Sequence, residues 1–496
     1  MTDRSGVIFG NAMRASTIRK AERAKAAYLR EFGDDSSRPF RLGVRPVPIL
    51  GDLGVDELTV EEDGSGASGL DLSADERALV IGTIRMGFGH YRISMAIASA
   101  ARARGLHPYW FDLHSFSGTS GGRIIAKLNG LYSMGSRWSQ KYPLFNRLYW
   151  EPLNSEGFRK LSYNAVDQKV AEIMATPCGL LPKGVPYVAT HAWPAQAALH
   201  AGLERVVNVI PDNWPMALHL SEGAIHCVQS PSAWQGYKLL RGMRGDETPK
   251  PMPKGSVVYT GHYIDHELVS NLEEDTAARV SRLQGGQPLR VLLTIGGAGA
   301  QRELFKAVIE RLLPAVGIGR VCLLINVGDH HEVLDWLRGA VLGLSAAVVH
   351  SDDWAGTKRL AAAALAEGAS SGSVEGVHLF HDADIFAAVY ATNLLMRASD
   401  LLVTKPSELA FYPIPKLHLR RVGGHEAWGA IRSAELGDGG VECGSVKETL
   451  AMLDLLLDDR EGLALMNERI LAAKRAGVYD GAYRAVDLAC GLRDSE

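Results

Sequence analysis

The sequence predicts an α/β protein built of two doubly wound, Rossmann-like domains that face each other across a cleft. Two observations support this prediction. An apolar run rich in β-branched residues, ALVIGTI at 78–84, leads into a glycine-rich turn and then into a helical pattern. The same order returns at 289–316, where LRVLLTIGGAGA precedes a second helical pattern. Each strand, glycine-rich loop and helix in this order begins a parallel sheet, so we expect two such sheets.

The composition excludes several classes of protein. The chain has 496 residues, 46% hydrophobic and 22% charged, which suits two or three globular domains of ~100–200 residues each. Its net charge of −3 does not favour a nucleic-acid partner. Five widely spaced cysteines argue against a disulfide scaffold or a zinc site and are typical of a reducing compartment. The chain lacks a run of ~18 apolar residues and a signal-peptide pattern, so we expect a cytoplasmic protein without a transmembrane helix.

The first 77 residues predict a largely flexible extension. Residues 1–47 are basic and rich in alanine, a composition compatible with a helix, whereas residues 48–77 are acidic and rich in glycine and serine, as linkers are. The basic part has two interpretations: a solvated tail, or a helix that contacts anionic lipid.

Two domains are expected after the extension. The first covers 78–265, with a helix at 91–106 and strands at 78–84, 107–113, 186–190, 205–210, 225–229 and 256–260. The second covers 266–476, with strands beginning at 289 and at 320–328, 400–406 and 414–419, and with helices over 446–476. Within it, residues 341–377 are longer and more polar than an ordinary connection and predict a partly mobile insertion. Residues 477–496 are expected to form a C-terminal tail.

Polar residues and glycines follow the predicted strands of the first domain. In Met86-Gly87-Phe88-Gly89-His90 the glycines let the backbone approach a ligand, and His90 suits a base or a ligand of sugar hydroxyls; the alternative is a tight structural turn. His191 follows the strand at 186–190, where a structural histidine is the alternative, and Asp212 and Asn213 follow the strand at 205–210. Asp212 is a candidate base or the partner of one. The loop matches neither the dinucleotide motif GxGxxG nor the P-loop.

Three loops of the second domain have similar chemistry. Gly296-Gly297-Ala298-Gly299-Ala300 lies where the first glycine loop lies in the first domain. Thr404-Lys405-Pro406-Ser407-Glu408 ends a strand, and Glu408 suits two ribose hydroxyls; the alternative is a helix capped by Ser407. Gly423-Gly424-His425-Glu426 follows the next strand and suits a polyhydroxylated ligand, with a simple polar loop as the alternative.

Together these motifs resemble the GT-B-fold glycosyltransferases that include monogalactosyldiacylglycerol synthase, bacterial diacylglycerol glucosyltransferases and, more distantly, the lipid II-forming N-acetylglucosaminyltransferase. The resemblance spans about 78–476. It is based on the turn that closes with His90, on IPDNWPMALHL at 210–220, on VVYTGHYI at 257–264 and on GGAGA. The most specific match is VTKPSELAFYPIPKL at 403–417. The aromatic and basic stretch 124–150 lies where these enzymes have a membrane-facing acceptor segment; an ordinary packed helical insertion is the alternative.

The resemblance implies an inverting transfer of a sugar from a nucleotide-diphosphate donor, a UDP-sugar, to a hydroxyl acceptor such as a membrane lipid. It implies a co-substrate without a further cofactor or metal, and a protein that is cytoplasmic or peripheral on the inner face of the membrane; it predicts no oligomeric state. The catalytic residues would be His90 and Asp212. The donor site would comprise Gly296, Gly297, Ala298, Gly299, Lys405, Ser407, Glu408, Gly424, His425 and Glu426. The acceptor site would comprise Gly87, Phe88, Gly89, His191, Asn213, Tyr142 and Trp150.

Departures from the family pattern leave other functions open. The family has several glycines between Thr-Lys-Pro and Ser-Glu, which this chain lacks, and it has Gln and Asn where this chain has His425 and Gly429. The alternatives are a transferase with a soluble small-molecule or peptide acceptor, a hydrolase of the nucleotide-sugar epimerase type, and a GT-B scaffold that has lost catalysis and serves as a binding module.

Overall fold

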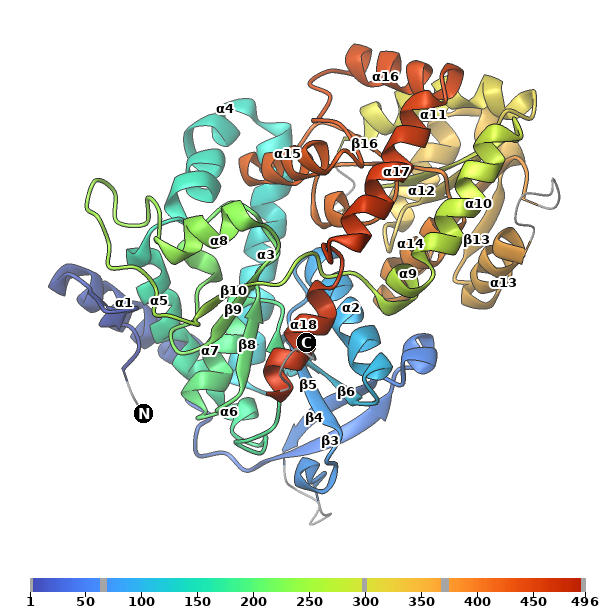
Figure 1. Cartoon of the computed structure of the whole chain (residues 1–496). Coiled ribbons are helices and arrows are strands. Elements are labelled where there is room, and N and C mark those ends of the chain that lie inside the picture. The colour runs from blue at the N-terminus through green and yellow to red at the C-terminus, as the bar shows by residue number, and fades with distance from the viewer. Residues whose placement is uncertain (1–2, 63–68, 297–300, 367–373, 492–496) are drawn as a thin grey trace. The chain divides into compact units, whose positions relative to one another are not determined.

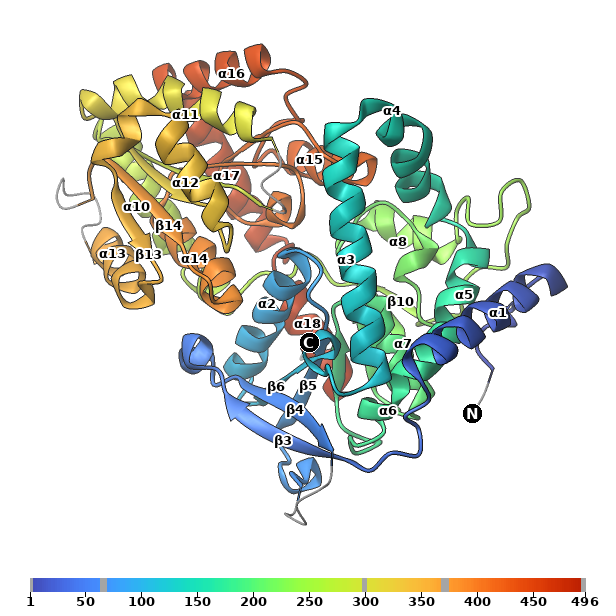
Figure 2. The ribbon, with the colours of Figure 1, turned by 180° about the vertical axis from the view of Figure 1, so that it is seen from behind.

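The computed structural model describes residues 3–62, 69–296, 301–366 and 374–491 and divides the chain into two compact units (Figures 1 and 2). Unit 1 consists of Met1–Tyr263 and Asp480–Glu496, and unit 2 consists of Ile264–Tyr479. The expected domain boundary, after residue 265, lies close to the passage of the chain from unit 1 to unit 2. Each unit has its own sheet and its own core.

Unit 1 contains an eight-stranded sheet with the order β10-β9-β8-β7-β5-β6-β4-β3. Neighbouring strands are parallel, except that β3 and β4 form an antiparallel pair at one edge. The strands expected from short apolar runs are confirmed. Such runs suit strands that are buried under helices on both faces of the sheet. The strands are β3 (Phe40–Pro46), β4 (Asp56–Glu62), β5 (Ala78–Thr83), β6 (His107–Asp112), β7 (Tyr187–Ala189), β8 (Val206–Val209), β9 (Ile225–Val228) and β10 (Val257–Tyr259), with a separate ribbon of β1 (Val7–Ile8) and β2 (Asn11–Ala12).

Helices cover both faces of this sheet. The crossovers from β5 through α2 to β6 and from β7 through α7 to β8 run in opposite directions, so right-handed connections place α2 and α7 on opposite faces. Helix α18 packs beside α2, and α5 packs on α7. The helices are α1 (Ala15–Phe32), α2 (Gly89–Ala103), α3 (Ser120–Lys141), α4 (Pro143–Phe145), α5 (Leu161–Ala171), α6 (Ala175–Cys178), α7 (Ala192–His200), α8 (Pro231–Lys238) and α18 (Gly481–Cys490). Shorter turns are η1 (Pro48–Leu53), η2 (Leu72–Ala74), η3 (Leu113–Ser115), η4 (Asn146–Trp150), η5 (Leu153–Gly157), η6 (Glu172–Met174) and η7 (Ala217–His219).

The N-terminal region differs from the largely flexible extension that we expected over residues 1–77. Its strands β3 and β4 extend the sheet beyond β6, and α1 packs on α5. Leu42 and Leu58 are buried in the core of unit 1, which explains why the acidic, linker-like composition around them did not prevent a strand pair. The part of the expected linker at residues 63–68 lies outside the described residues.

The C-terminal segment also differs from the tail expected at 477–496. Its described part forms α18 on the α2 face of unit 1. Asp487 of α18 accepts two hydrogen bonds from the guanidinium of Arg104, at 3.0 and 2.8 Å. Residues 492–496 lie outside the described residues.

Unit 2 contains a six-stranded, fully parallel sheet with the order β13-β14-β12-β11-β15-β16. By the same handedness argument, α11 and α12 lie on one face and α13 and α14 on the other. The strands are β11 (Leu289–Thr294), β12 (Val321–Asn326), β13 (Val348–Ser351), β14 (Val377–His381), β15 (Leu401–Thr404) and β16 (Lys416–His418). The helices are α9 (His266–Ser270), α10 (Leu272–Gln284), α11 (Arg302–Gly317), α12 (His331–Ala340), α13 (Trp354–Ala366), α14 (Ile385–Ala398), α15 (Ala427–Leu436), α16 (Val446–Asp458) and α17 (Glu461–Arg475), with short turns η8 (Leu342–Ala346), η9 (Glu408–Phe411) and η10 (Gly424–Glu426).

The insertion expected at 341–377 contains regular elements of the fold. It includes η8, β13 and α13. Strand β13 pairs with β14 at the edge of the sheet, and α13 packs on α14. The polar and small residues of this region fit an edge strand, which is only partly buried. Residues 367–373 lie outside the described residues.

Candidate functional site

Both sheets have a point at which the strand order reverses, and ligands of doubly wound folds bind at the carboxyl ends of the strands there. In unit 1 the chain proceeds from β5 to β6 on one side and from β7 to β8 on the other, so the reversal lies between β5 and β7. In unit 2 it lies between β11 and β15. Four of the predicted residues lie in the segments that follow these four strands: His90, His191, Gly296 and Lys405.

His90 is held in one tautomer. Its Nδ1 lies 2.7 Å from the carbonyl oxygen of Thr190. A carbonyl oxygen can only accept a hydrogen bond, so Nδ1 carries the proton and Nε2 of the neutral ring carries the lone pair. The loop before it turns through Gly87, whose φ of +69° is a left-handed conformation that favours glycine. The turn places His90 in the first turn of α2 as a group that can accept a proton.

His191 lies against His90 and also caps a helix. The two rings meet edge to face, with centroids 4.9 Å apart. Nδ1 of His191 accepts a hydrogen bond from the backbone N–H of Trp193 at 3.1 Å and thereby caps α7. Burial holds the pKa of His191 well below its ordinary value, and the neighbouring His90 and His219 oppose a positive charge on it as well. His191 is therefore neutral, with its proton on Nε2, and it combines the structural role with a place beside the candidate base.

Asp212 is joined to a second histidine. Its Oδ2 lies 3.3 Å from Nε2 of His219, whose Nδ1 lies 2.6 Å from the hydroxyl of Tyr237. That hydroxyl donates to the carbonyl oxygen of Trp214 at 3.1 Å, so it accepts from Nδ1–H of His219. Both ring nitrogens of His219 therefore face hydrogen-bond acceptors, and His219 links the Asp212 carboxylate to the hydroxyl of Tyr237. His219 is part of the motif at 210–220, but sequence reasoning did not select it as a site residue.

The other residues predicted around the first glycine loop have mainly structural contacts. The Oδ1 atom of buried Asn213 accepts a hydrogen bond from Oγ of Ser230 at 3.1 Å, which joins the loops after β8 and β9. Phe88 precedes α2 and Gly89 is its first residue. These three residues shape the edge of the sheet on which His90 lies.

Asp112, at the carboxyl end of β6, was missed by the sequence analysis. It accepts a hydrogen bond from the hydroxyl of Tyr91 at 2.6 Å and others from His114 and Ser115. Burial raises the pKa of Asp112 to about 6, although these hydrogen bonds oppose the rise. Since Tyr91 follows His90 directly, this contact fixes the first turn of α2 to the sheet. The only indication in the sequence was an aspartate at the end of an apolar strand.

In unit 2, Lys405 forms an ion pair with Glu426, and its side chain passes close to Gly296. The Lys405 ammonium contacts Oε1 of Glu426, and Oε2 accepts from the backbone N–H groups of Val422 and Gly423 at 2.7 and 3.3 Å. Burial alone would raise the pKa of Glu426, but nearby positive charge, chiefly that of Lys405, and the hydrogen bonds to the carboxylate outweigh it, and the pKa lies below its usual value. A Cβ atom on Gly296 would lie 3.9 Å from Cε of Lys405, so the loops after β11, β15 and β16 meet here.

The segment after Lys405 differs from the expected helix. Only the four-residue turn η9 follows, and the side chain of Ser407 makes no capping hydrogen bond. Instead, the backbone N–H of Ser407 donates to the carbonyl oxygen of Lys405 at 2.8 Å. A tight turn replaces the glycines of the resembling family and leaves Glu408 half-buried at the start of η9.

The remaining predicted donor residues lie in two loops. Gly424 and His425 belong to η10, and Nδ1 of His425 is buried without a hydrogen-bond partner among the residues described. Gly297, Ala298 and Gly299 lie outside the described residues. Within the described part of the chain, no group of three or more His, Cys, Asp or Glu side chains could hold a metal ion.

Tyr142 and Trp150, predicted to bind an acceptor, have different surroundings. Trp150 packs inside its own segment, against Tyr132 and against Gly135, where a Cβ atom would lie 2.0 Å from the indole. Tyr142, at the end of α3, has 49% of its surface exposed. Trp150 therefore stabilises the segment, whereas Tyr142 is accessible.

Residues 7–239 match the domain of unknown function DUF6937, and residues 252–490 match the domain of unknown function DUF6938. The second match covers unit 2 and continues into α18 of unit 1. No curated protein matches the chain.

Solved structures with low similarity to the chain include enzymes of nucleotide-sugar chemistry. A putative UDP-N-acetylglucosamine 2-epimerase from Listeria monocytogenes is 13% identical, with a TM-score of 0.44 over 84% of this chain and 97% of that one. A UDP-GlcNAc 2-epimerase from Neisseria meningitidis, bound to UDP-GlcNAc, is 11% identical, with a TM-score of 0.42 over 84% and 98%. An α,α-trehalose 6-phosphate synthase from Burkholderia multivorans is 13% identical, with a TM-score of 0.43 over 84% and 98%. At these TM-scores the likeness supports no conclusion about function.

Proposed function

We propose that the chain is an inverting glycosyltransferase that moves a sugar from a nucleoside diphosphate donor, a UDP-sugar, to a hydroxyl acceptor. The observation that supports this best is His90 at the strand reversal of unit 1, with Nδ1 bound to a carbonyl oxygen and Nε2 able to accept a proton. A hydroxyl becomes a strong nucleophile only when a base removes its proton during attack. His90 suits that role, and Asp212, which contacts His219, is the second candidate for it.

In the proposed reaction, Nε2 of His90 takes the acceptor proton while the acceptor oxygen attacks the anomeric carbon. The bond from that carbon to the diphosphate oxygen breaks, and the electron pair leaves with the nucleoside diphosphate. Attack on the face opposite the leaving group inverts the anomeric centre. The leaving diphosphate gains negative charge, which the Lys405 ammonium and the N-terminus of α11 would stabilise.

The donor would lie at the strand reversal of unit 2. Glu426 keeps Lys405 directed along Gly296, so that the cation lies beside the loop where a diphosphate would bind. We assign Glu408 to the ribose hydroxyls, as the carboxylates of other nucleotide-binding folds are used. Ser407, Gly424, His425 and the glycine loop that begins at Gly296 would complete the donor site.

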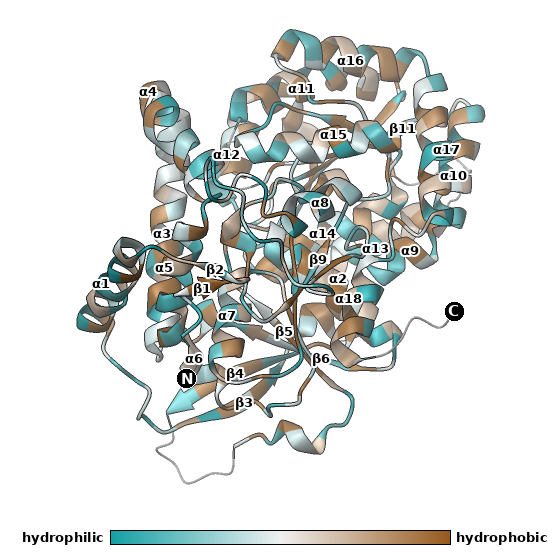
Figure 3. Cartoon of the chain, turned by 60° about the vertical axis from the view of Figure 1, so that its left-hand side comes forward, coloured by the Kyte–Doolittle hydropathy of each residue, from teal (hydrophilic) through white to brown (hydrophobic). Residues whose placement is uncertain are grey.

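A lipid acceptor is supported by the segment from α3 to η4, in which hydrophobic and hydrophilic residues alternate (Figure 3) and several apolar side chains are exposed. Leu144 and Leu148 have 70% and 68% of their surfaces exposed, and Lys141 and Arg147 lie beside them. Exposed apolar side chains flanked by cations are typical of segments that lie in a lipid interface. Other large, exposed apolar residues of this segment are Leu131, Tyr132, Met134, Trp138, Tyr142 and Tyr149. No helix of the described residues is both long and apolar enough to cross a bilayer.

The first experiment tests donor binding and catalysis together. A panel of UDP-, GDP- and TDP-sugars is tested by thermal shift, since a ligand at 100 times its Kd adds ~2.7 kcal/mol of stability. We expect a shift with one nucleotide that Glu408→Ala abolishes. Release of UDP should fall by ~10²–10⁴-fold in His90→Gln, because the base is lost, while nucleotide binding is retained. His350→Gln, in the edge strand β13, is the matched control.

Two results would contradict this proposal. Absence of a shift with every nucleotide would favour a scaffold that has lost catalysis, and unchanged UDP release in His90→Gln would show that His90 is not the base. The acceptor is tested separately by flotation with liposomes that contain anionic lipid. We expect Leu144→Asp/Leu148→Asp to stop flotation and Leu342→Asp, at a residue 90% exposed in unit 2, to leave it unchanged. Flotation unaffected by the double substitution would favour a soluble acceptor.

A further inference from the structure

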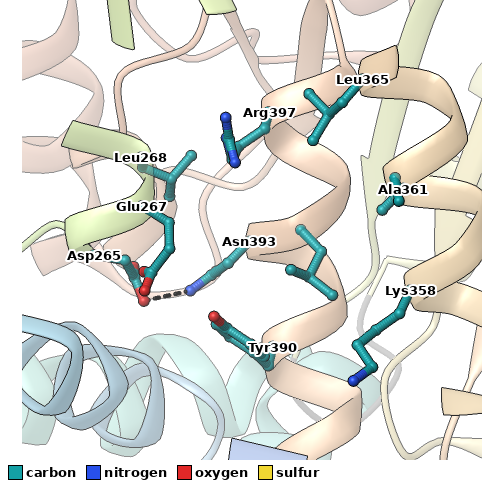
Figure 4. A pocket seen from close by; sticks show the side chains of 11 residues that line it. Asp265, Glu267, Leu268, Lys358, Ala361, Leu365, Tyr390, Asn393 and Arg397 are labelled. Carbon is teal, nitrogen blue, oxygen red and sulfur yellow. Dashed lines mark hydrogen bonds between the residues drawn. The ribbon is translucent and has the colours of Figure 1, made fainter. Parts of the chain in front are cut away.

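Unit 2 contains a pocket that the proposed transfer does not use. It has a volume of about 240 Å³ and lies among helices α9, α13 and α14 (Figure 4). These helices lie beside a face of the sheet, whereas the donor residues lie in the loops at its carboxyl edge. The pocket is therefore a separate site within the same unit.

The walls of this pocket differ in chemistry. Leu268, Leu365 and Leu394, together with the alanines at 361 and 362, form an apolar surface. Helix α9 and the residue before it contribute carboxylates, whereas Lys358 lines the pocket from α13 on the opposite side (Figure 4). A pocket with an apolar wall and charges of opposite sign on opposite sides suits a small molecule that has both charges.

One of the carboxylates, Asp265, has a structural role. It is buried and accepts hydrogen bonds from Nδ2 of Asn393 at 2.9 Å and from the hydroxyl of Tyr412 at 3.1 Å. These bonds join the start of α9 to α14. Arg397, a basic residue at the pocket, is held in a similar way by Asp275 through bonds of 2.9 and 3.1 Å. The positions of α9 and α14 are thus fixed without help from a ligand.

The second carboxylate, Glu267, is not satisfied in this way. Its Oε2 atom is buried and has no hydrogen-bond partner among the residues that the structure describes. A buried carboxylate oxygen without a donor loses its hydrogen bonds to water and gains none from the protein. Because Glu267 lines the pocket, a ligand that brings a charged N–H donor would pair with this carboxylate.

We propose that this pocket binds a small aliphatic zwitterion, of the size and chemistry of an α-amino acid. Its ammonium group donates to Glu267, its carboxylate faces Lys358, and its side chain lies against the apolar wall. The inference goes beyond the proposed transfer and does not depend on it. A ligand here contacts α9, which begins just after the chain enters unit 2, so binding would stabilise that helix.

The test uses the full chain and L-leucine as the probe, with binding measured by isothermal titration calorimetry. We expect binding at one site that Glu267→Gln weakens at least 10-fold. The matched control is Glu274→Gln, an exposed glutamate in the first turn of α10, which should bind leucine as the unmodified chain does. Isoamylamine and isovalerate, which each lack one charge of leucine, should bind more weakly than leucine.

A second variant keeps the test independent of the charge change. Ala361→Leu adds bulk to the pocket wall and should abolish leucine binding while the nucleotide-induced thermal shift is unchanged. The proposal is overturned if leucine does not bind at 10 mM or binds Glu267→Gln equally well. It is also overturned if isovalerate binds as tightly as leucine, because Lys358 rather than Glu267 would then dominate. If the unmodified chain binds leucine but no nucleotide, the result contradicts the proposed transferase and not this site.

Discussion

Asp167 of α5 makes the stability of unit 1 depend on pH in a predictable direction. The side chain is buried, its Oδ2 has no hydrogen-bond partner among the described residues, and the Trp193 side chain donates one hydrogen bond to it. Burial raises the pKa of Asp167 from 3.8 to about 8, and the Trp193 bond opposes this rise only in part. Asp167 is therefore largely protonated at neutral pH.

The magnitude follows from the difference between the folded and unfolded pKa values. A difference of 8 − 3.8, about four, corresponds to ~6 kcal/mol at 1.36 kcal/mol for each pH unit, as an upper limit. Because the folded-state pKa is the higher one, the contribution is complete below about pH 4. It is lost as the pH rises from about 4 towards 8, because the unfolded chain then releases the Asp167 proton while the native state still holds it. Asp167→Asn cannot ionise, so its stability should not follow this loss.

The assay is urea unfolding from pH 5 to pH 9, followed by hydrogen exchange of peptides from α5 and α7, which report on unit 1. We expect Asp167→Asn to gain several kcal/mol relative to the unmodified chain between pH 5 and pH 9. Peptides from α16 and α17 in unit 2 should not change, and Asp246→Asn, at an exposed residue of unit 1, should behave as the unmodified chain does. A stability difference that does not vary with pH would refute the reasoning.

Two further predictions concern buried contacts of the described residues. Lys416→Met should lower the stability of unit 2 by ~3–5 kcal/mol in urea unfolding, because it leaves the buried carboxylate of Asp438, 2.9 Å away, without its cation. Lys416→Met/Asp438→Asn should recover much of this loss, and equal losses in both variants would contradict the explanation. Gly481→Ala should increase hydrogen exchange in α18, because the added Cβ would lie 2.3 Å from the carbonyl oxygen of Gly261. Gly184→Ala, where the Cβ would meet nothing within 4 Å, is the control; equal exchange in the two variants would argue against the clash.

The parallel strands of both units could be predicted from sequence because their physical cause is local. A strand buried on both faces needs a continuous apolar run, and ALVIGTI and LRVLLTIGGAGA are such runs bounded by glycines. Strand β13 is only partly buried at an edge, so its apolar pattern is too weak to distinguish it from a loop. Strands β3 and β4 were missed because acidic and glycine-rich flanks dominated the composition around them.

The boundary between the units could be predicted only in part. The strand-like apolar runs of the first domain end before residue 265, and this indicated the passage from unit 1 to unit 2. The return of the chain to unit 1 was not visible, since α18 is an ordinary amphipathic helix by its sequence. Its place depends on Arg104, 383 residues away, and on the close approach of Gly481 to the backbone of Gly261. Contacts over such distances in the chain leave no periodic pattern.

The same distinction separates what could and could not be inferred about the site. His90, Asp212 and Lys405 were selectable because each follows a strand, and a strand end can be recognised in the sequence. Their partners were not selectable, because the partner is set by which strands are neighbours. His90 meets Thr190 only because β5 pairs with β7, with Gly82 opposite Ala189.

Contacts between neighbouring strands also change the meaning of the residues in which this chain differs from the resembling family. Judged by sequence, the missing glycines after Lys405 and the replaced residues at 425 and 429 suggest a weakened donor site. The structure shows that Lys405 does not act alone, since Glu426 holds it and is itself held by two backbone N–H groups. A cation fixed in this way beside Gly296 can replace backbone donors at a diphosphate. Lys405→Met should therefore weaken UDP binding in the thermal-shift assay more than Ser407→Ala does. The opposite order would favour a scaffold that has lost catalysis.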